Sequence, residues 1–269
     1  MKDQNPDVLK AIEINRQTWN DRTNAHYSSG FYDSSAFAKA KNSLNSYEIN
    51  ALGNVTGKSV LHLQCHFGQD SLSWAHKGAT VTGVDFSETA INKARELSAE
   101  LKIPAKFVSC NVFDTASHID KKFDIVFTSY GVIGWLPDLK PWAQMIATML
   151  KPGGTFYMVE FHPIAWMFDY LEKPAVMKYP YSNKEVIYEE YSGSYASTES
   201  DLNSKEYTWN HPLSEVIQSL IDAGLTIELF AEHDGSPYNV FPEMTKKGDL
   251  YYLENQLYPT IFEIKATRS

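Results

Sequence analysis

Cysteine is scarce in this chain, with only two among 269 residues. That count argues against a disulfide scaffold and fits a reducing compartment. Basic runs are missing too: the formal net charge is -9, so a nucleic-acid backbone is not expected as a partner. No apolar run is long enough to span a bilayer, and the N-terminus is too polar for a signal peptide. We therefore expect a cytoplasmic protein with no membrane partner.

Glycine is missing from a turn where a nucleotide-binding fold normally uses it. The stretch "SVLHLQCHFGQDSLSWA" (59–75) predicts an apolar strand, a turn that ends at Gly68, and a helix. Gln64 and His66 stand where small residues are expected, and they must adopt costly torsions or move the turn. The G-x-G-x-x-G pattern is absent, which argues against a nicotinamide-dependent dehydrogenase.

From residue 59 onward the chain alternates between strand and helix patterns. Helical periodicity occurs over 87–101 and 138–150, where Ser87 is a good N-cap for the first of these helices. Between and around the helices lie short apolar, β-branched runs that predict strands, at 59–63, 79–84, 105–110, 123–129 and 155–160. This order predicts an α/β fold with a mainly parallel sheet and helices on both faces.

The end of the chain follows a different pattern. A helix near 213–223 precedes two strand patterns, 225–231 and 260–267, with no clear helical pattern between them. We expect these two strands to pair antiparallel at one edge of the sheet.

Two segments lie outside this alternation. Residues 1–50 predict a long amphipathic helix and a polar stretch, which we interpret as an N-terminal helical cap on a main domain over 51–269. Residues 161–212 carry alternating tyrosines and are far longer than an ordinary strand–helix connection. We expect this insertion to form a substrate cover, with the N-terminal segment as the opposite wall. The alternative is an extra sheet or the contact of a homodimer.

Three positions lie at the ends of the first three predicted strands, at the edge where α/β sheets bind ligands: Gly68, Asp85 and Asn111. Asp85 ends the second strand, 21 residues after Gln64, and a carboxylate there suits two ribose hydroxyls. Asn111 ends the third strand, and its amide both donates and accepts, as an adenine edge requires. The alternative for Asp85 is a helix cap.

Five stretches in order resemble the successive motifs of class I S-adenosylmethionine-dependent methyltransferases. They are "VLHLQCHFG", "VTGVDFS", "FVSCNVFD", "FDIVFTSYGVIGWLPDL" and "LKPGGTFYMVE", within about residues 57–160. The resemblance implies a Rossmann-like fold of about seven strands with an antiparallel edge strand. It also implies S-adenosylmethionine as the cofactor and methyl transfer to a small-molecule substrate.

The chain departs from that family at the glycine turn, which here reads His62, Gln64, His66, Gly68, and at Asn111, where an acidic residue is usual. Gln64 and His66 could add donors toward the cofactor's carboxylate. The departures also leave open a second function, a non-catalytic binding protein that keeps the fold and has lost turnover.

The resemblance and the strand ends together give a set of candidate site residues. Aromatic faces attract a sulfonium cation, so Tyr130, directly after the fourth strand, is a candidate for both cofactor binding and catalysis. The predicted cofactor-binding residues are Trp19, Gln64, His66, Gly68, Asp85, Phe86, Asn111, Val112 and Tyr130.

A general base is less clearly indicated. His162 follows Glu160 at the end of the fifth strand, and an ordinary histidine pKa of about 6.5 suits a base. The alternative is that His162 only shapes the exit loop. His62, Cys65 and His66 lie close in sequence, but no further ligand stands at a telling spacing, so no metal is expected.

Overall fold

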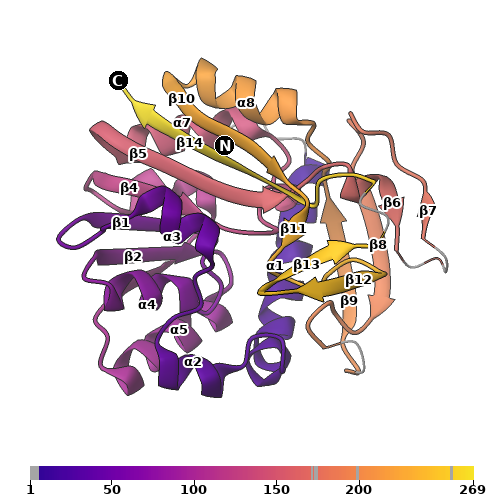
Figure 1. Ribbon diagram of the computed structural model, residues 1–269, viewed down its shortest axis with the longest axis horizontal. Coiled ribbons are helices and arrows are strands. Elements are labelled where there is room, and N and C mark those ends of the chain that lie inside the picture. The colour runs from indigo at the N-terminus through magenta and orange to yellow at the C-terminus, as the bar shows by residue number, and fades with distance from the viewer. Residues whose placement is uncertain (1–5, 171, 173–174, 198–199, 255–256) are drawn as a thin grey trace.

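The computed structural model describes residues 6–170, 172, 175–197, 200–254 and 257–269. Its centre is a seven-stranded sheet in the order β10-β14-β5-β4-β1-β2-β3 (Figure 1). The strands are β1 Ser59–Leu63, β2 Thr80–Asp85, β3 Lys106–Ser109, β4 Phe123–Thr128, β5 Leu150–Phe161, β10 Leu225–His233 and β14 Ile261–Arg268.

The predicted fold class is confirmed. Strands β1 to β5 pair parallel to their neighbours, and β14 pairs antiparallel with both β10 and β5. The pairing of the last two strands is therefore as expected. The antiparallel strand β14 lies one place in from the edge that β10 forms.

Helices cover both faces of this sheet because successive residues of each strand point to opposite sides. Val60 of β1 packs in the hydrophobic cluster that contains Trp74, on one face of the sheet. The next residue, Leu61, packs in the hydrophobic cluster that contains Trp142, on the other face. The first face carries α3 (Ser46–Leu52), α4 (Gln69–His76) and α5 (Glu88–Leu101), and the second carries α7 (Leu139–Met149) and α8 (Leu213–Asp222). The short α6 (Thr115–His118) contacts α7.

Over residues 6–50 the structure has two helices and the start of a third, rather than one helix and a polar stretch. They are α1 (Pro6–Ser28), α2 (Ser34–Ala40) and α3. Helix α1 contacts α5 and the inserted strand β9 (Asn203–Thr208). The N-terminal boundary predicted at residue 50 falls inside α3, which packs on β5.

The insertion over 161–212 contains two small antiparallel sheets. One joins β6 (Phe168–Asp169) to β7 (Val176–Met177), and the other joins β8 (Ile187–Ser192) to β9. Because α1 packs directly on β9, the N-terminal helix and the insertion lie side by side (Figure 1). Helix α1 and the insertion are thus in direct contact, and the arrangement of the whole N-terminal segment as the wall opposite the insertion stays a prediction.

A third small sheet lies between β10 and β14, where no separate unit was expected. It contains β11 (Gly235–Ser236), β12 (Met244–Lys247) and β13 (Leu250–Leu253) in the order β11-β13-β12. Figure 1 shows it beyond the arrowhead of β5. Within the described parts of the chain, no helix is long and apolar enough to cross a membrane.

Candidate functional site

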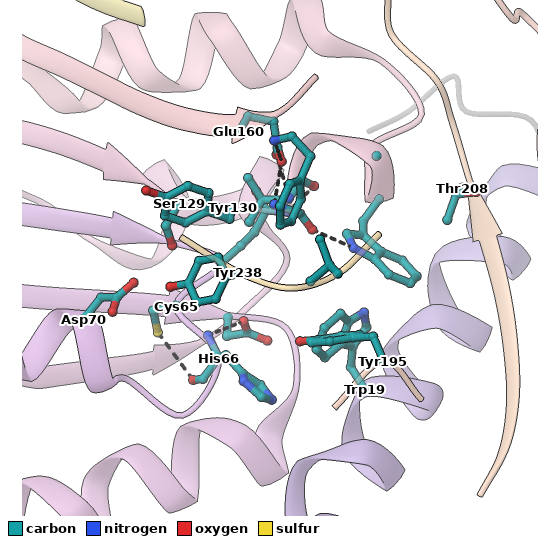
Figure 2. A pocket seen from close by; sticks show the side chains of 18 of the residues that line it. Trp19, Cys65, His66, Asp70, Ser129, Tyr130, Glu160, Tyr195, Thr208 and Tyr238 are labelled. Carbon is teal, nitrogen blue, oxygen red and sulfur yellow. Dashed lines mark hydrogen bonds between the residues drawn. The ribbon is translucent and has the colours of Figure 1, made fainter. Parts of the chain in front are cut away.

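A cavity of about 650 Å³ lies at the carboxyl edge of the parallel strands. Its lining includes residues that follow β1, β2, β3 and β4, together with residues of α1, the insertion and the loop after β11. Figure 2 shows Asp70, Cys65 and Ser129 at one side of this space and Thr208 of β9 at the other. A cavity of this size at the switch point of an α/β sheet suits a nucleotide-sized ligand and a small second molecule.

Eight of the predicted cofactor-binding residues come from the strand ends and one from α1, and the structure brings all nine to this cavity. They are Trp19, Gln64, His66, Gly68, Asp85, Phe86, Asn111, Val112 and Tyr130. Their contacts with a ligand stay predictions.

The turn after β1 has left-handed backbone torsions at three positions, two of which are not glycine. Gln64, His66 and Gly68 have φ of 53°, 50° and 79°, all in the left-handed region. Only glycine adopts this region without a steric cost, which is about 1–2 kcal/mol for other residues. Of the two alternatives from the sequence, the structure shows the first: Gln64 and His66 take the costly torsions.

The two unusual side chains of the turn have different surroundings. The Gln64 amide Nε2 donates to the Val132 carbonyl at 2.9 Å, which ties this turn to the loop after β4. The other amide atom, Gln64 Oε1, is buried without a partner among the described residues, as are both ring nitrogens of His66. Burial and the nearby His26 and Arg22 hold the His66 pKa well below its usual value, so the ring is neutral. A neutral imidazole offers one donor and one acceptor.

Asp85 does not cap the helix that follows it. The N-cap of α5 is Ser87, whose hydroxyl accepts from the Ala90 N–H at 3.1 Å, as the sequence predicts. The Asp85 carboxylate instead accepts from the backbone N–H groups of His66 at 2.9 Å and Ser87 at 2.8 Å. Burial raises the Asp85 pKa to about 6. The side chain therefore joins the first turn to the second strand end beside the cavity.

The end of β3 supplies one polar and one apolar position. The Asn111 side chain accepts from the Phe113 N–H at 3.1 Å and caps the short 3-10 helix Val112–Asp114. This hydrogen bond uses the amide oxygen of Asn111. Among the described residues, no hydrogen bond of the Asn111 amide nitrogen is seen. Val112 is buried, and Phe86 is half-buried at the same wall.

Tyr130 lines the cavity with its ring, and its hydroxyl points to α3. The Tyr130 hydroxyl donates to Glu48 Oε2 at 3.0 Å, and its ring meets that of Tyr238 edge-on at 4.9 Å. Glu48 is completely buried, and burial raises its pKa to about 7. Tyr130 is thereby held in place by a group outside the cavity.

Glu160 is a structural anchor for the loop after β4. Its carboxylate accepts from the backbone N–H groups of Val132 at 2.7 Å, Ile133 at 3.0 Å and Phe161 at 2.6 Å, and also from Gly131. Figure 2 shows this carboxylate directed at that loop. With four backbone donors bound, Glu160 holds the loop that carries Tyr130 rather than acting as a free base.

His162, the predicted base, is not among the residues that line the cavity. Its Nε2 lies 2.7 Å from Glu232 Oε1 on β10, and its Nδ1 accepts from the Ile164 N–H at 3.2 Å. Successive residues of an extended strand point to opposite sides. Glu160 and His162 would therefore point to the same side only if the strand continued through His162. Strand β5 ends at Phe161, so this condition is not met. These contacts hold His162 at the exit of β5, and its role as a base stays a prediction.

The N-terminal helix and the insertion meet through a buried ion pair. Arg22 Nη2 lies 2.6 Å from Glu206 Oε2, and the same guanidinium donates to the Tyr191 and Ser204 hydroxyls. The Arg22 side chain is only 1% exposed. Arg22 therefore fixes the inserted strands and does not line the cavity itself.

Above the turn, aromatic rings of the N-terminal segment and of the insertion meet. The hydroxyls of Tyr32 and Tyr195 lie 2.5 Å apart, and the ring of His66 lies 5.3 Å from that of Tyr32. On the other side Trp19 meets His66 edge-on at 5.2 Å. Of the insertion's tyrosines, Tyr170, Tyr179, Tyr191 and Tyr195 line the cavity, whereas Tyr181, Tyr188 and Tyr207 do not.

Sequence reasoning missed several lining residues. Asp70, in the first turn of α4, accepts from the Ser43 hydroxyl at 2.5 Å, and burial raises its pKa. The sequence feature that could have indicated Asp70 as a lining residue is its position two residues after Gly68. Tyr238 comes from the segment between β10 and β14, for which the sequence showed no pattern. Among the described residues no group of three or more His, Cys, Asp or Glu is placed to hold a metal ion.

Comparison with known proteins agrees with this geometry. Residues 60–154 match the family model of a methyltransferase domain. A ubiquinone biosynthesis O-methyltransferase of Photorhabdus laumondii is 30% identical over 134 residues, which are 49% of this chain and 55% of that protein. An uncharacterized methyltransferase of Synechocystis sp. is 32% identical over 114 residues, 42% of this chain and 51% of that protein. The chain thus spans about half the length of the curated relatives it matches.

Solved structures share the fold over more of the chain. The magnesium protoporphyrin IX methyltransferase of Synechocystis with bound S-adenosylhomocysteine has a TM-score of 0.58 at 18% identity, covering 96% of this chain and 100% of that one. An S-adenosylmethionine-dependent methyltransferase of Clostridium acetobutylicum has a TM-score of 0.58 at 13% identity, covering 88% of this chain and 97% of that one. The resemblance to class I methyltransferases is confirmed, and the Rossmann-like fold is common to these proteins.

Proposed function

We propose that this chain, whose residues 60–154 form a methyltransferase domain of the class I S-adenosylmethionine-dependent type, transfers a methyl group to a small-molecule acceptor. The observation that carries the proposal is one cavity lined by the ends of four parallel strands within the matched segment. The curated relatives are methyltransferases, which does not favour the alternative of a binding protein without turnover.

S-adenosylmethionine fits the polar and aromatic groups that line this cavity. Asp85 has a carboxylate for the ribose hydroxyls, and Asn111 has an amide for the adenine edge. The unpartnered ring nitrogens of His66 and the Gln64 oxygen meet polar groups of the ligand, since buried polar atoms without partners are unfavourable. The rings of Trp19 and Tyr130 suit a sulfonium cation. These four features support the cofactor assignment.

When bound, the cofactor supplies the methyl group and the positive charge that activates it. The chain's own residues then align the acceptor and exclude water. Glu160 and His162 are both held by other protein groups, so we assign neither as a base. Tyr130 acts through the position of its ring, because its hydroxyl is bound to Glu48. The insertion over 161–212 covers the acceptor through Tyr179, Tyr191 and Tyr195.

A turnover assay tests this proposal. The purified chain is incubated with S-adenosylmethionine and a metabolite library, and formation of S-adenosylhomocysteine is measured against a reaction without library compounds. We expect binding of S-adenosylhomocysteine by calorimetry and turnover with at least one library pool. Binding without any turnover would favour the non-catalytic alternative, and absence of binding would remove the methyltransferase proposal.

We also propose a cytoplasmic location and leave a homodimer as a prediction. Both cysteines are free and buried, which fits a reducing compartment. The net charge of -9 supports a small-molecule substrate over a nucleic acid. Sedimentation at micromolar concentration distinguishes a monomer of 30.5 kDa from a dimer.

A further inference from the structure

The lining of the cavity has a distinct chemical character. Among the described residues that line it, none is lysine or arginine. Six acidic residues do line it: Asp33, Asp70, Asp85, Glu160, Glu189 and Glu206. An anionic ligand such as a carboxylate or a phosphate normally meets a basic side chain in a protein site. This lining therefore disfavours an anionic acceptor.

The inner face of the β8–β9 hairpin carries two of these acids. Alternate residues of the two strands line the cavity, namely Ile187, Glu189, Tyr191, Glu206 and Thr208. Glu189 pairs directly with Glu206 across the strands. Like charges placed opposite each other in a sheet are destabilising, so this pair needs compensation from another group.

Only Glu206 has such compensation in the described chain. Arg22 pairs with it at 2.6 Å. Among the described residues, no cation lies within 4.0 Å of the Glu189 carboxylate. The hydrogen bond shown for this carboxylate in that part of the chain is a long one, which it accepts from the Tyr179 hydroxyl at 3.5 Å. Lys178 lowers the Glu189 pKa through its charge, but its ammonium group is bound to Asp169 at 2.6 Å. Burial, and after it Glu206, raise the Glu189 pKa.

We propose that Glu189 binds a cationic amine on the acceptor molecule, and that the acceptor is a planar, largely apolar amine. The aromatic part lies among the rings that line this end of the cavity, Trp135, Trp166, Phe168, Tyr170, Tyr179 and Tyr191. Such rings bind flat apolar groups and also attract cations. A protonated amine has no free lone pair, so Glu189 anchors the acceptor and another atom of it receives the methyl group.

This inference rests on the proposed methyltransferase function. The acidic residues at the strand ends, such as Asp85, face the proposed cofactor, whereas Glu189 lies on the inserted hairpin. Figure 2 separates these two regions: Thr208 of the hairpin lies across the cavity from Asp70. Substitution of Glu189 should therefore change acceptor binding and leave cofactor binding unchanged.

The test uses charge-matched ligands and one pair of variants. Tryptamine and phenethylamine, together with indole-3-acetate and phenylacetate, are titrated into the full chain saturated with S-adenosylhomocysteine. The variants are Glu189→Gln and, as a control, Glu190→Gln on the exposed face of the same strand. Thermal melting verifies that both variants fold.

We expect the amines to bind the unchanged chain at least about tenfold more tightly than the acids. Glu189→Gln should weaken amine binding by about ten- to a hundredfold, as the loss of a charge-assisted bond predicts, and Glu190→Gln should not. Acids that bind as well as amines, amine binding unaffected by Glu189→Gln, or no amine binding up to millimolar concentration would each overturn the inference. Failure to bind S-adenosylhomocysteine would instead count against the proposed function.

Discussion

Arg22 on α1 and Glu206 on β9 are 184 positions apart in sequence and 2.6 Å apart in space. Their side chains are 1% and 10% exposed, so the pair is shielded from water. The pair fixes the hairpin that forms one wall of the cavity to the N-terminal helix. The position of that wall therefore depends on a residue far outside the insertion.

We predict that Arg22→Met destabilises the protein by about 3–5 kcal/mol, because it leaves Glu206 buried without its cation. The double variant Arg22→Met, Glu206→Gln should recover a large part of that loss, since the uncompensated charge is gone. Urea unfolding of the two single variants and the double variant measures the coupling. Purely additive losses would show that the ion pair does not hold the wall.

Glu48 provides a prediction for the pH dependence of stability. Burial raises its pKa from 4.5 to about 7 in the folded chain. A raised pKa means that the folded state keeps a proton that the unfolded state has lost. The resulting contribution to stability is fully present below pH 4.5 and is lost as the pH rises through about 7.

Glu48→Gln removes this titration and keeps an acceptor for the Asn45 N–H. Relative to the unchanged chain, the variant should gain stability by about 3 kcal/mol between about pH 4.5 and about pH 8. Urea unfolding at both pH values measures the difference. Equal pH slopes in the two proteins would mean that the buried carboxyl is not the cause.

Gly68 provides a steric test of the turn after β1. Its φ is +79°, and an added Cβ would lie 2.7 Å from Phe107 Cε1. Gly153 is a matched control, with a φ of +72° and nothing within 4 Å of an added Cβ. Both alanine substitutions carry the torsional cost, and only Gly68→Ala adds a clash of about 1–3 kcal/mol. Chemical unfolding should show the larger loss for Gly68→Ala, and equal losses would contradict the described turn.

The sheet was predictable because each strand carries its own signal. Strand β1 has the predicted bounds 59–63, and α5 begins after its predicted cap at Ser87. These patterns are local: apolar alternation and a capping side chain act within a few residues. The position of Asp85 beside the turn follows from the parallel order of β1 and β2.

The walls of the cavity were less predictable because they depend on distant contacts. No local pattern indicates that Arg22 meets Glu206 or that α1 packs on β9. The contact of His162 with Glu232 could not be predicted for a related reason, since Glu232 lies 70 residues later. The alternation in "EVIYEEYSGSYAS" did indicate a strand, and the same alternation places Glu189 with Ile187 and Tyr191 on one face.

Binding of S-adenosylmethionine at the turn that Asp85 holds is the central requirement of the proposed function. Calorimetric titration of S-adenosylhomocysteine into the unchanged chain and into the variant Asp85→Asn tests it directly. The amide that replaces the carboxylate keeps one acceptor oxygen for a backbone N–H, so circular dichroism should show a folded variant. We predict measurable binding to the unchanged chain and a loss of about ten- to a hundredfold in affinity for the variant. No binding to the unchanged chain, or equal affinity in both proteins, would contradict this assignment.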